Sequence, residues 1–506
     1  MTGTGSIGAA PDRVAAPPFP SPVSHARRLL LVTYHFAPSR EAGALRWIKL
    51  ARFAVERGYL LDVIALDPAS LKACDWPTLE TLPPGVRVYG IPESQPTIDR
   101  VMRWGLTVRA WLRRIMGRHG PVTGCAPPSE PEPDTRPESL SRSEMRGPEA
   151  SGRDAVRAYN AWRDYARGKA WARRAARLAA GLLARNRYAA VISCGPPHMA
   201  HFAGLRIARA ARLPFVMDHR DLWSCVPRLP ESVASPLWYA MARRYERRAI
   251  RHASLVVMNT ELSRTVQAGA YPDLADRVIA VMNGYDDEPL PASRRGRCFV
   301  MAYTGSVYLD RDPRPLFRAV ARIVTEQALA PGDLRLEFMG ATASYGGTTL
   351  ATMAEQEGIA AFVGIQPSRP RHEALQLLAD AALLVSLPQD TVTAIPSKIF
   401  EYLRFNAWLL ALTNPDSATA QVLAGTGADV IAPEDLEGIA AAIRRRYLAY
   451  AAGQRPRRLL VREDLSRRAQ ADKFFDALVT CITASEQRRV TPRHRGVRRR
   501  EPSREC

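Results

Sequence analysis

The sequence predicts an α/β fold of two doubly wound domains that face each other across a central cleft. Two observations carry this prediction. Short apolar runs alternate with helix-like segments over residues 27–290, and the same alternation repeats over residues 297–455. Such alternation is typical of parallel sheets that helices cover on both faces. The length of 506 residues is sufficient for two or three domains.

The first half contains apolar runs bounded by Gly, Pro and polar residues. Strands are predicted at 29–34, 60–66, 86–91, 188–193, 214–217, 254–258 and 278–282. Helices are predicted at 44–57 and 199–211, and Gly58 ends the first of them. These elements form one N-terminal domain over 27–290, preceded by a disordered segment, 1–26, that is rich in Gly, Ala and Pro.

An insertion at 95–187 interrupts this domain. Its middle part, 119–153, has too little apolar content to fold and is predicted to be disordered. The flanking segments, 98–118 and 161–185, place tryptophans and leucines at helical spacing among many arginines. Such helices either lie on an anionic membrane surface or pack on the domain, and the sequence leaves both readings open.

The second half repeats the alternation. Strands are predicted at 299–303, 334–339, 361–364, 382–387, 408–412 and 429–432. A terminal helix follows within 460–485, and residues 486–506 form a basic tail. Successive doubly wound domains place a ligand cleft between the carboxyl ends of their sheets.

The composition limits the partners. The formal charge is +21, from 71 basic and 50 acidic residues, which favours phosphate-rich partners. No nucleic-acid-binding signature is present, so no specific nucleic-acid partner is predicted. Seven scattered cysteines without a CxxC pair indicate a reducing compartment. No apolar run reaches the roughly 18 residues of a membrane span, and a cytoplasmic location is expected.

The segment 395–403 opens a predicted helix with groups suited to a nucleotide diphosphate. Pro396 fits the first helical turn, and Ser397, Lys398 and Glu401 fall in one sector of the helix. Lys398 is expected to neutralise phosphate oxygens, and Glu401 to accept hydrogen bonds from ribose hydroxyls. The alternative is an ordinary solvated helix face.

A second polar group follows the strand at 214–217. Asp218, Arg220 and Asp221 would orient an acceptor hydroxyl or hold phosphate; the alternative is an Arg-Asp ion pair at a strand end. His198 begins a helix that faces the same cleft. Gly43 would let a diphosphate approach the backbone. No metal-binding motif stands in a suitable place, so no metal is predicted.

The order of these elements, with PSKIFEYL at 396–403, resembles the family 4 (group 1) glycosyltransferases of the GT-B fold, in the branch that builds polysaccharides and glycolipids. The resemblance covers most of residues 28–485, with matching stretches at 30–59, 194–208, 215–223, 278–286, 302–308 and 427–443. It implies two Rossmann-like domains, an acceptor site in the first, a nucleotide-sugar site in the second, and a terminal helix that crosses back to the first.

The resemblance also implies roles for particular residues. Those near the acceptor and the transferred sugar, expected to be catalytic, are Asp218, Arg220, Asp221 and His198. Those that bind the donor are Gly43, Gly305, Ser306, Arg311, Gly364, Ile365, Ser397, Lys398 and Glu401. No cofactor is expected beyond the nucleotide-sugar co-substrate.

The function implied is that of a retaining hexosyltransferase that acts on a cell-surface polysaccharide or lipid-linked acceptor, on the inner face of the plasma membrane. Two departures stand out: Thr393 replaces a glutamate and Ser306 an arginine that relatives carry. They support an alternative, a catalytically inactive GT-B scaffold. A nucleotide-sugar epimerase is a further alternative, disfavoured because nine histidines are spread thinly. The sugar, base, acceptor, linkage and oligomeric state stay open.

Overall fold

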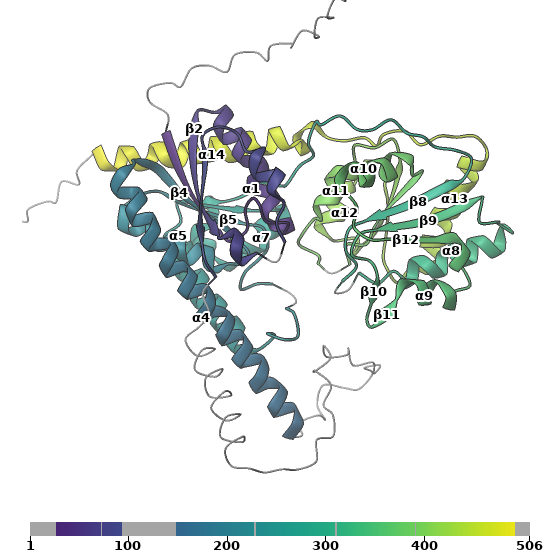
Figure 1. Ribbon diagram of the computed structural model, residues 1–506, viewed down its shortest axis with the longest axis horizontal. Coiled ribbons are helices and arrows are strands. Elements are labelled where there is room, and N and C mark those ends of the chain that lie inside the picture. Colours follow the sequence, from purple (N-terminus) through teal and green to yellow (C-terminus); the bar gives the residue numbers. More distant parts are fainter. Residues whose placement is uncertain are drawn as a thin grey trace, which may run out of the picture.

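Two α/β domains lie side by side in the computed structural model (Figure 1). The structure describes residues 27–71, 73–93, 148–226, 229–308, 311–389 and 391–490. Each domain is built on one sheet whose neighbouring strands are all parallel, with helices on both faces. The predicted fold class is thereby confirmed.

The N-terminal sheet has the order β3-β2-β1-β4-β5-β6-β7. Its strands are β1 (Arg27–Thr33), β2 (Tyr59–Leu66), β3 (Val86–Ile91), β4 (Tyr188–Gly195), β5 (Phe215–His219), β6 (Leu255–Met258) and β7 (Val278–Ala280). The central strand β1 is apolar and almost fully buried, because its neighbours β2 and β4 and the helices on both faces shield it from water.

Helices cover this sheet in two layers. The layer of one face contains α1 (Ala42–Glu56) and α14 (Arg467–Val490). The other face carries α4 (Pro148–Arg185), α5 (Met199–Ala211) and α6 (Pro236–Ile250). The short α2 (Trp76–Glu80) follows β2, and α7 (Glu261–Ala270) follows β6.

The position of α4 decides between the two readings for segment 161–185 of the insertion. Its apolar side is buried in the domain core, through Ala161, Tyr165, Trp171, Ala172, Ala175, Ala179 and Leu182. Segment 161–185 therefore packs on the domain, and its apolar face is not available to a bilayer. Residues 148–153, expected to be disordered, form the first turns of α4. The predicted helix at 98–118, and residues 119–147, lie outside the described part of the chain.

The C-terminal sheet has the order β12-β9-β8-β13-β14-β15. Its strands are β8 (Phe299–Thr304), β9 (Leu334–Met339), β12 (Val363–Gln366), β13 (Leu383–Ser386), β14 (Trp408–Leu412) and β15 (Asp429–Ile431). The helices are α8 (Arg314–Glu326), α9 (Leu350–Gln356), α10 (Arg371–Asp380), α11 (Ser397–Tyr402), α12 (Ala418–Leu423) and α13 (Leu436–Ala451). A small hairpin of β10 (Ser344–Tyr345) and β11 (Thr348–Thr349) was not expected from the sequence.

After the second domain the chain returns to the first. Helix α14, yellow in Figure 1, runs along the N-terminal domain. Its Phe474, Phe475, Leu478 and Ile482 are buried in the same cluster as Trp47 of α1. The segment 1–26 and residues 491–506 of the basic tail lie outside the described residues. Among the described helices, none combines the length and apolarity needed to cross a bilayer.

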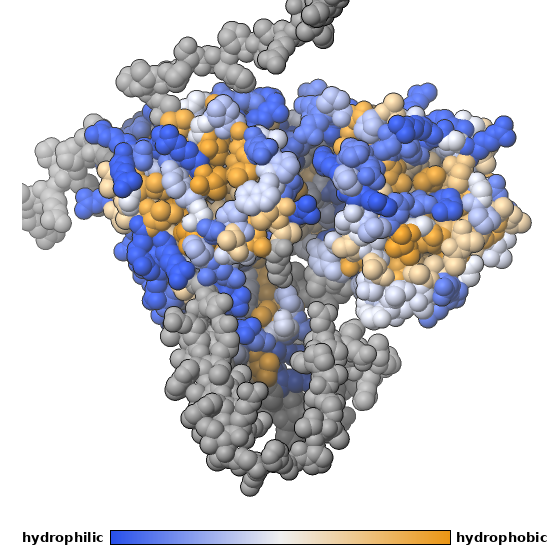
Figure 2. Space-filling model, viewed as in Figure 1, coloured by the Kyte–Doolittle hydropathy of each residue, from blue (hydrophilic) through white to orange (hydrophobic). Residues whose placement is uncertain are grey.

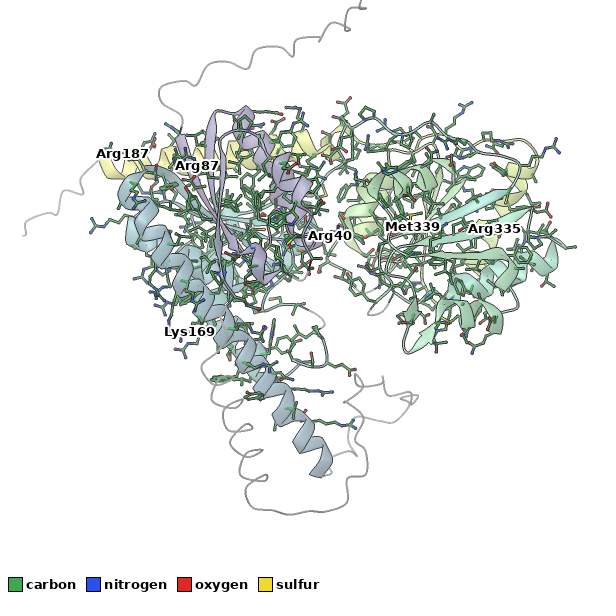
Figure 3. All side chains as sticks on the ribbon, viewed as in Figure 1. Arg40, Arg87, Lys169, Arg187, Arg335 and Met339 are labelled. Atoms are coloured by element: carbon green, nitrogen blue, oxygen red, sulfur yellow. The ribbon has the colours of Figure 1, made fainter. Side chains whose placement is uncertain are left out.

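The two sheets direct their carboxyl ends toward the space between the domains. In Figure 3, β9 runs from Arg335, on the far side of its domain, to Met339, nearer the N-terminal domain, and Arg40, in the loop after β1, lies on the side of the N-terminal domain that faces it. Figure 2 shows the groove between the domains. The cavity there has a volume of about 2380 Å³.

Candidate functional site

The donor side of the cavity is built around α11. Ile399, Phe400 and Tyr402 are buried against the sheet, which turns Ser397, Lys398 and Glu401 toward the cavity that all three line. The Tyr402 hydroxyl accepts a hydrogen bond from Thr304 N at 3.0 Å, which ties α11 to the end of β8. Because α11 is only six residues long, its dipole is small, and the side chains supply the chemistry.

Lys398 lies beside a stretch of backbone that has no side chain. Its Nζ donates to Thr304 O at 2.8 Å and lies 3.7 Å from the centre of the Tyr303 ring. Gly305, directly after β8, has a φ of +121°, and a Cβ there would lie 2.9 Å from Lys398 Nζ. Gly340 after β9 packs directly on Gly305. The absence of side chains here brings backbone and an ammonium group to the same place, as phosphate sites require.

Glu401 is paired with a residue that the sequence did not single out. Its Oε1 lies 2.7 Å from Arg371 Nη2, and the Arg371 side chain is 58% exposed. Arg404 also lines the cavity and donates to the carbonyl of Glu288. Arg371 stands at the start of a different helix, α10, so no local spacing relates it to Glu401.

Of the other residues expected to bind the donor substrate, some line the cavity and others do not. Ser306 and Arg311 line the cavity, and the Arg311 guanidinium lies 4.3 Å from the centre of the Tyr308 ring. Gly364 and Ile365 lie on the edge strand β12 and are not among the lining residues. Their assignment to the nucleobase stays a prediction.

Thr393 uses its main chain to join the domains. Its carbonyl oxygen accepts hydrogen bonds from Thr260 Oγ1 at 2.6 Å and Ser263 Oγ at 2.9 Å. Both donors belong to the beginning of α7 in the N-terminal domain. The loop that leads to α11 is thereby attached to the acceptor domain.

On the acceptor side, Asp218 is fully buried and does not line the cavity. Its carboxylate accepts from Arg46 Nε and Nη2, both at 2.9 Å, and from Trp47 Nε1 at 2.7 Å. Burial acts to lower the pKa of Arg46, but the charge and hydrogen bonds of Asp218 raise it above its ordinary value. This arrangement suits a positioning role, and a catalytic role for Asp218 stays a prediction.

Arg220 and Asp221 both line the cavity. The Arg220 guanidinium donates to the carbonyl of Pro196 and packs directly against Gly43. The space above Gly43, which the sequence assigned to the donor, is therefore occupied by a side chain in this structure. The Nε atom of Arg220 is buried without a hydrogen-bond partner.

His198 also lines the cavity, and it stacks on Trp223 with ring centres 5.2 Å apart. Behind it lie His201 and His219, whose rings stack with centres 4.3 Å apart. Burial lowers the pKa of all three histidines, and that of His198 and His201 falls well below its usual range. All three are therefore neutral at pH 7. Within the described residues they are the group whose ligand atoms could hold a metal ion.

Charged residues also join α1 and α14 to the segment that follows β7, at the edge of the cavity. Lys49 of α1 lies 2.6 Å from Glu288 and 3.2 Å from Asp286, and Arg467 of α14 lies 2.6 Å from Asp286. The hydrogen bond from Lys49 is the main cause that lowers the pKa of Glu288. The sequence did not reveal these pairs, because their members are far apart along the chain.

The fold defines the class to which this arrangement belongs: two Rossmann-like domains that face a central cleft, as in the GT-B fold. A glycosyltransferase from Rickettsia africae ESF-5 has a TM-score of 0.51 at 9% identity, with 92% of this chain and 98% of that chain covered. The α,α-trehalose 6-phosphate synthase of Burkholderia multivorans has a TM-score of 0.50 at 12% identity, with 93% and 100% covered. No protein-family model and no curated sequence matches the chain.

Proposed function

We propose that this chain is a glycosyltransferase that moves a sugar from a nucleotide-sugar donor to a cell-surface polysaccharide or lipid-linked acceptor. The observation that carries the proposal is the convergence of Lys398, Glu401 and the Gly305 backbone in one interdomain cavity. An ammonium group and bare backbone suit a diphosphate, and a carboxylate beside them suits the two hydroxyls of a ribose.

The proposed reaction needs little side-chain chemistry. The donor would bind with its diphosphate at Gly305 and Lys398, and its sugar would point toward Arg220, Asp221 and His198 on the opposite wall. With retention of configuration, the departing diphosphate leaves from the face that the acceptor attacks and takes the acceptor proton. The protein then contributes position and stabilisation of the leaving charge.

A membrane-surface location is part of the proposal, and electrostatics support it. The exposed side of α6 carries Arg243, Arg244, Arg247 and Arg248, and the exposed Arg251 directly follows the helix. Anionic headgroups attract such clusters at roughly 1 kcal/mol per basic residue near the surface. Sedimentation with anionic vesicles should therefore fall steeply as salt rises, whereas neutral vesicles should bind no protein.

Donor binding tests the central claim. We expect one of UDP, GDP, dTDP or ADP, or its sugar, to raise the melting temperature, and Lys398→Ala and Glu401→Ala to abolish the rise. Lys169→Ala on α4 and Glu355→Ala on α9 change the same residue types away from the cavity and should behave like the unchanged protein. If none of the four nucleotides or their sugars raised the melting temperature, the proposal would be contradicted.

Turnover separates the transferase from the scaffold alternative. The Thr393 side chain supports the scaffold alternative, because it has a hydroxyl where the family resemblance implies a carboxylate. Slow hydrolysis of the bound donor, measured as nucleotide release, is expected of a transferase even without acceptor. Selective binding with no release under any condition would support the scaffold.

A further inference from the structure

Three histidines meet at the carboxyl end of the N-terminal sheet and form what we call the histidine cluster. His198 and His201 stand at the start of α5, which follows β4, and His219 is the last residue of the neighbouring strand β5. Each offers one ring nitrogen such that the three nitrogens lie within 4.8 Å of one another. The cluster is separate from the donor-binding residues of the C-terminal domain.

Four of the six ring nitrogens of the cluster are buried without a hydrogen-bond partner among the described residues. His201 and His219 are fully buried. His198 Nδ1, His201 Nε2 and both ring nitrogens of His219 make no hydrogen bond of ordinary geometry to the described residues, although the backbone of Asp221 lies near enough to His219 to act on it. A buried polar atom without a hydrogen-bond partner is destabilising, so several such atoms at one point indicate that something else binds there.

The contacts of Ser193 are compatible with the tautomer of His201 that metal binding needs. Ser193 Oγ lies 2.8 Å from His201 Nδ1 and 3.4 Å from the carbonyl oxygen of Val216, which only accepts. If the hydroxyl donates to that carbonyl, His201 Nδ1 carries the proton and Nε2 presents its lone pair. Metal-bound histidines are commonly oriented in this way by a partner on the other nitrogen.

Gly195 leaves space beside two of the nitrogens. A Cβ at Gly195 would lie 2.8 Å from His201 Nε2 and 3.3 Å from His198 Nδ1. His201 Nε2 and His198 Nδ1, two of the unpartnered nitrogens, therefore border the volume that a side chain at Gly195 would fill.

The charge around the cluster is mixed. Arg220 opposes a further cation there. Glu246 is fully buried and close enough to act electrostatically on His219. Its carboxylate accepts hydrogen bonds from the neutral groups of Ser224, Gln267 and Tyr271, and no described residue forms an ion pair with it. A nearby cation would offset this buried negative charge.

We propose that the histidine cluster binds a transition-metal ion of the Zn²⁺ type. Three imidazoles are a ligand set that Zn²⁺ prefers, with N atoms about 2.0–2.1 Å from the ion and therefore about 3.4 Å from each other. Ring rotations would bring the nitrogens from their present spacing to that distance. Because His198 borders the cavity, a water molecule or a substrate oxygen would complete the coordination from that side.

Aromatic packing is the competing explanation. The stacking of His201 on His219 and of His198 on Trp223 accounts for the ring planes. It does not account for the choice of three imidazoles, because phenylalanine would stack without burying unpartnered nitrogens. The proposal does not depend on the proposed function, because it concerns ion binding alone.

Metal content of the untagged full-length protein tests the proposal. After a chelator has removed bound metal, added Zn²⁺ should bind at one ion per chain, measured by mass spectrometry of the bound metal and by titration calorimetry. Co²⁺ in its place should give the visible absorption bands of a tetrahedral nitrogen site. Thiolate-to-cobalt charge-transfer bands would instead assign the ion to a cysteine and overturn the proposal.

Four variants locate the ion. His219→Phe keeps the stacking and removes a ligand, and should weaken Zn²⁺ binding at least 100-fold. Ser193→Ala should weaken it about 10–100-fold, and Gly195→Ala should block it while it leaves every ligand in place. His252→Gln, on the exposed surface, should have no effect. Absence of stoichiometric Zn²⁺ and of the cobalt bands, or binding that His219→Phe changes less than twofold, would overturn the proposal.

Discussion

Asp218 shows how a polar residue at a strand end acts through others. Its carboxylate fixes Arg46 and Trp47 of α1, and Arg46 in turn donates to Asn259 and Asn283. Asn259 and Asn283 both line the cavity. One buried carboxylate therefore holds α1 on the sheet and orders part of the acceptor wall.

Substitution of Asp218 should destabilise the folded protein, because it leaves the Arg46 guanidinium buried without a counter-charge. We expect Asp218→Asn to lower the free energy of unfolding by about 3–5 kcal/mol. Urea denaturation measures the loss, and Asp273→Asn, at an exposed position, serves as the control and should change it by less than about 0.5 kcal/mol. If Asp218→Asn lowered the free energy of unfolding by as little as the control does, the Asp218–Arg46 pair would contribute little to stability.

The pair Arg371–Glu401 yields a second prediction at this scale. A ribose that takes both carboxylate oxygens must compete with Arg371, but an ion pair this exposed is worth only about 0–1 kcal/mol. Arg371→Ala should therefore tighten nucleotide binding by no more than about fivefold, in calorimetric titration. A tenfold loss of affinity would mean instead that Arg371 binds the donor phosphates directly.

At the scale of elements, α14 is joined to the rest of the molecule by apolar and charged contacts. Phe474 packs edge-on against Trp47 with ring centres 5.5 Å apart, and Phe475 stacks on Tyr59 at 6.0 Å. At the other end of this contact, Asp286 holds Arg467 at 2.6 Å and Lys49 at 3.2 Å. The apolar contacts provide most of the attachment, and the ion pairs make it sensitive to pH.

Burial acts to raise the pKa of Asp286, but Arg467 and Lys49 outweigh it and hold the pKa below its ordinary value. Such a carboxyl contributes its full stability above the unfolded-state pKa of about 3.9, and loses it as the pH falls through the folded-state pKa. The stability difference between the unchanged protein and Asp286→Asn should therefore shrink below about pH 4, in denaturation at several pH values. A difference that stays constant down to the folded-state pKa would contradict this assignment, and Asp273→Asn again provides the control.

Elements with buried apolar runs could be predicted from the sequence, whereas contacts across the cleft could not. The run at 408–412 coincides with β14, whose residues are all apolar and buried, because a strand inside a parallel sheet is apolar throughout. The runs at 86–91 and 334–339 coincide with β3 and β9, in which apolar residues alternate with Arg87, Arg335 and Glu337. The hairpin of β10 and β11 has two residues in each strand, too few for a periodic pattern. Lys398 and Glu401 could be singled out because they share one short helix.

The residues that the sequence did not reveal come from separate elements. Arg371 meets Glu401 from α10, and His219 meets His198 from another strand. Only the order of the strands brings such residues together, and that order is not a local property of the sequence. The same limit explains why the sequence did not indicate the histidine cluster: the three histidines have no common spacing.

At the scale of the whole molecule, the cavity is larger than one ligand needs. Its volume of about 2380 Å³ exceeds the roughly 300–1,000 Å³ of most small-molecule sites. The walls also belong to different domains, which are joined by polar contacts such as those of Thr260 and Ser263 with Thr393. A ligand that contacts both walls would gain by drawing the domains together, since closure removes water and strengthens each polar contact.

We therefore expect saturating donor to close the cleft. Small-angle X-ray scattering should record a smaller radius of gyration with the nucleotide sugar than without it. Lys398→Ala should show no change at the same ligand concentration, because it loses the diphosphate contact. The nucleoside alone should also leave the radius unchanged, since it reaches only the C-terminal wall. If the radius stays constant while calorimetry shows full occupancy, the cleft is rigid, and the excess volume is space for a large acceptor.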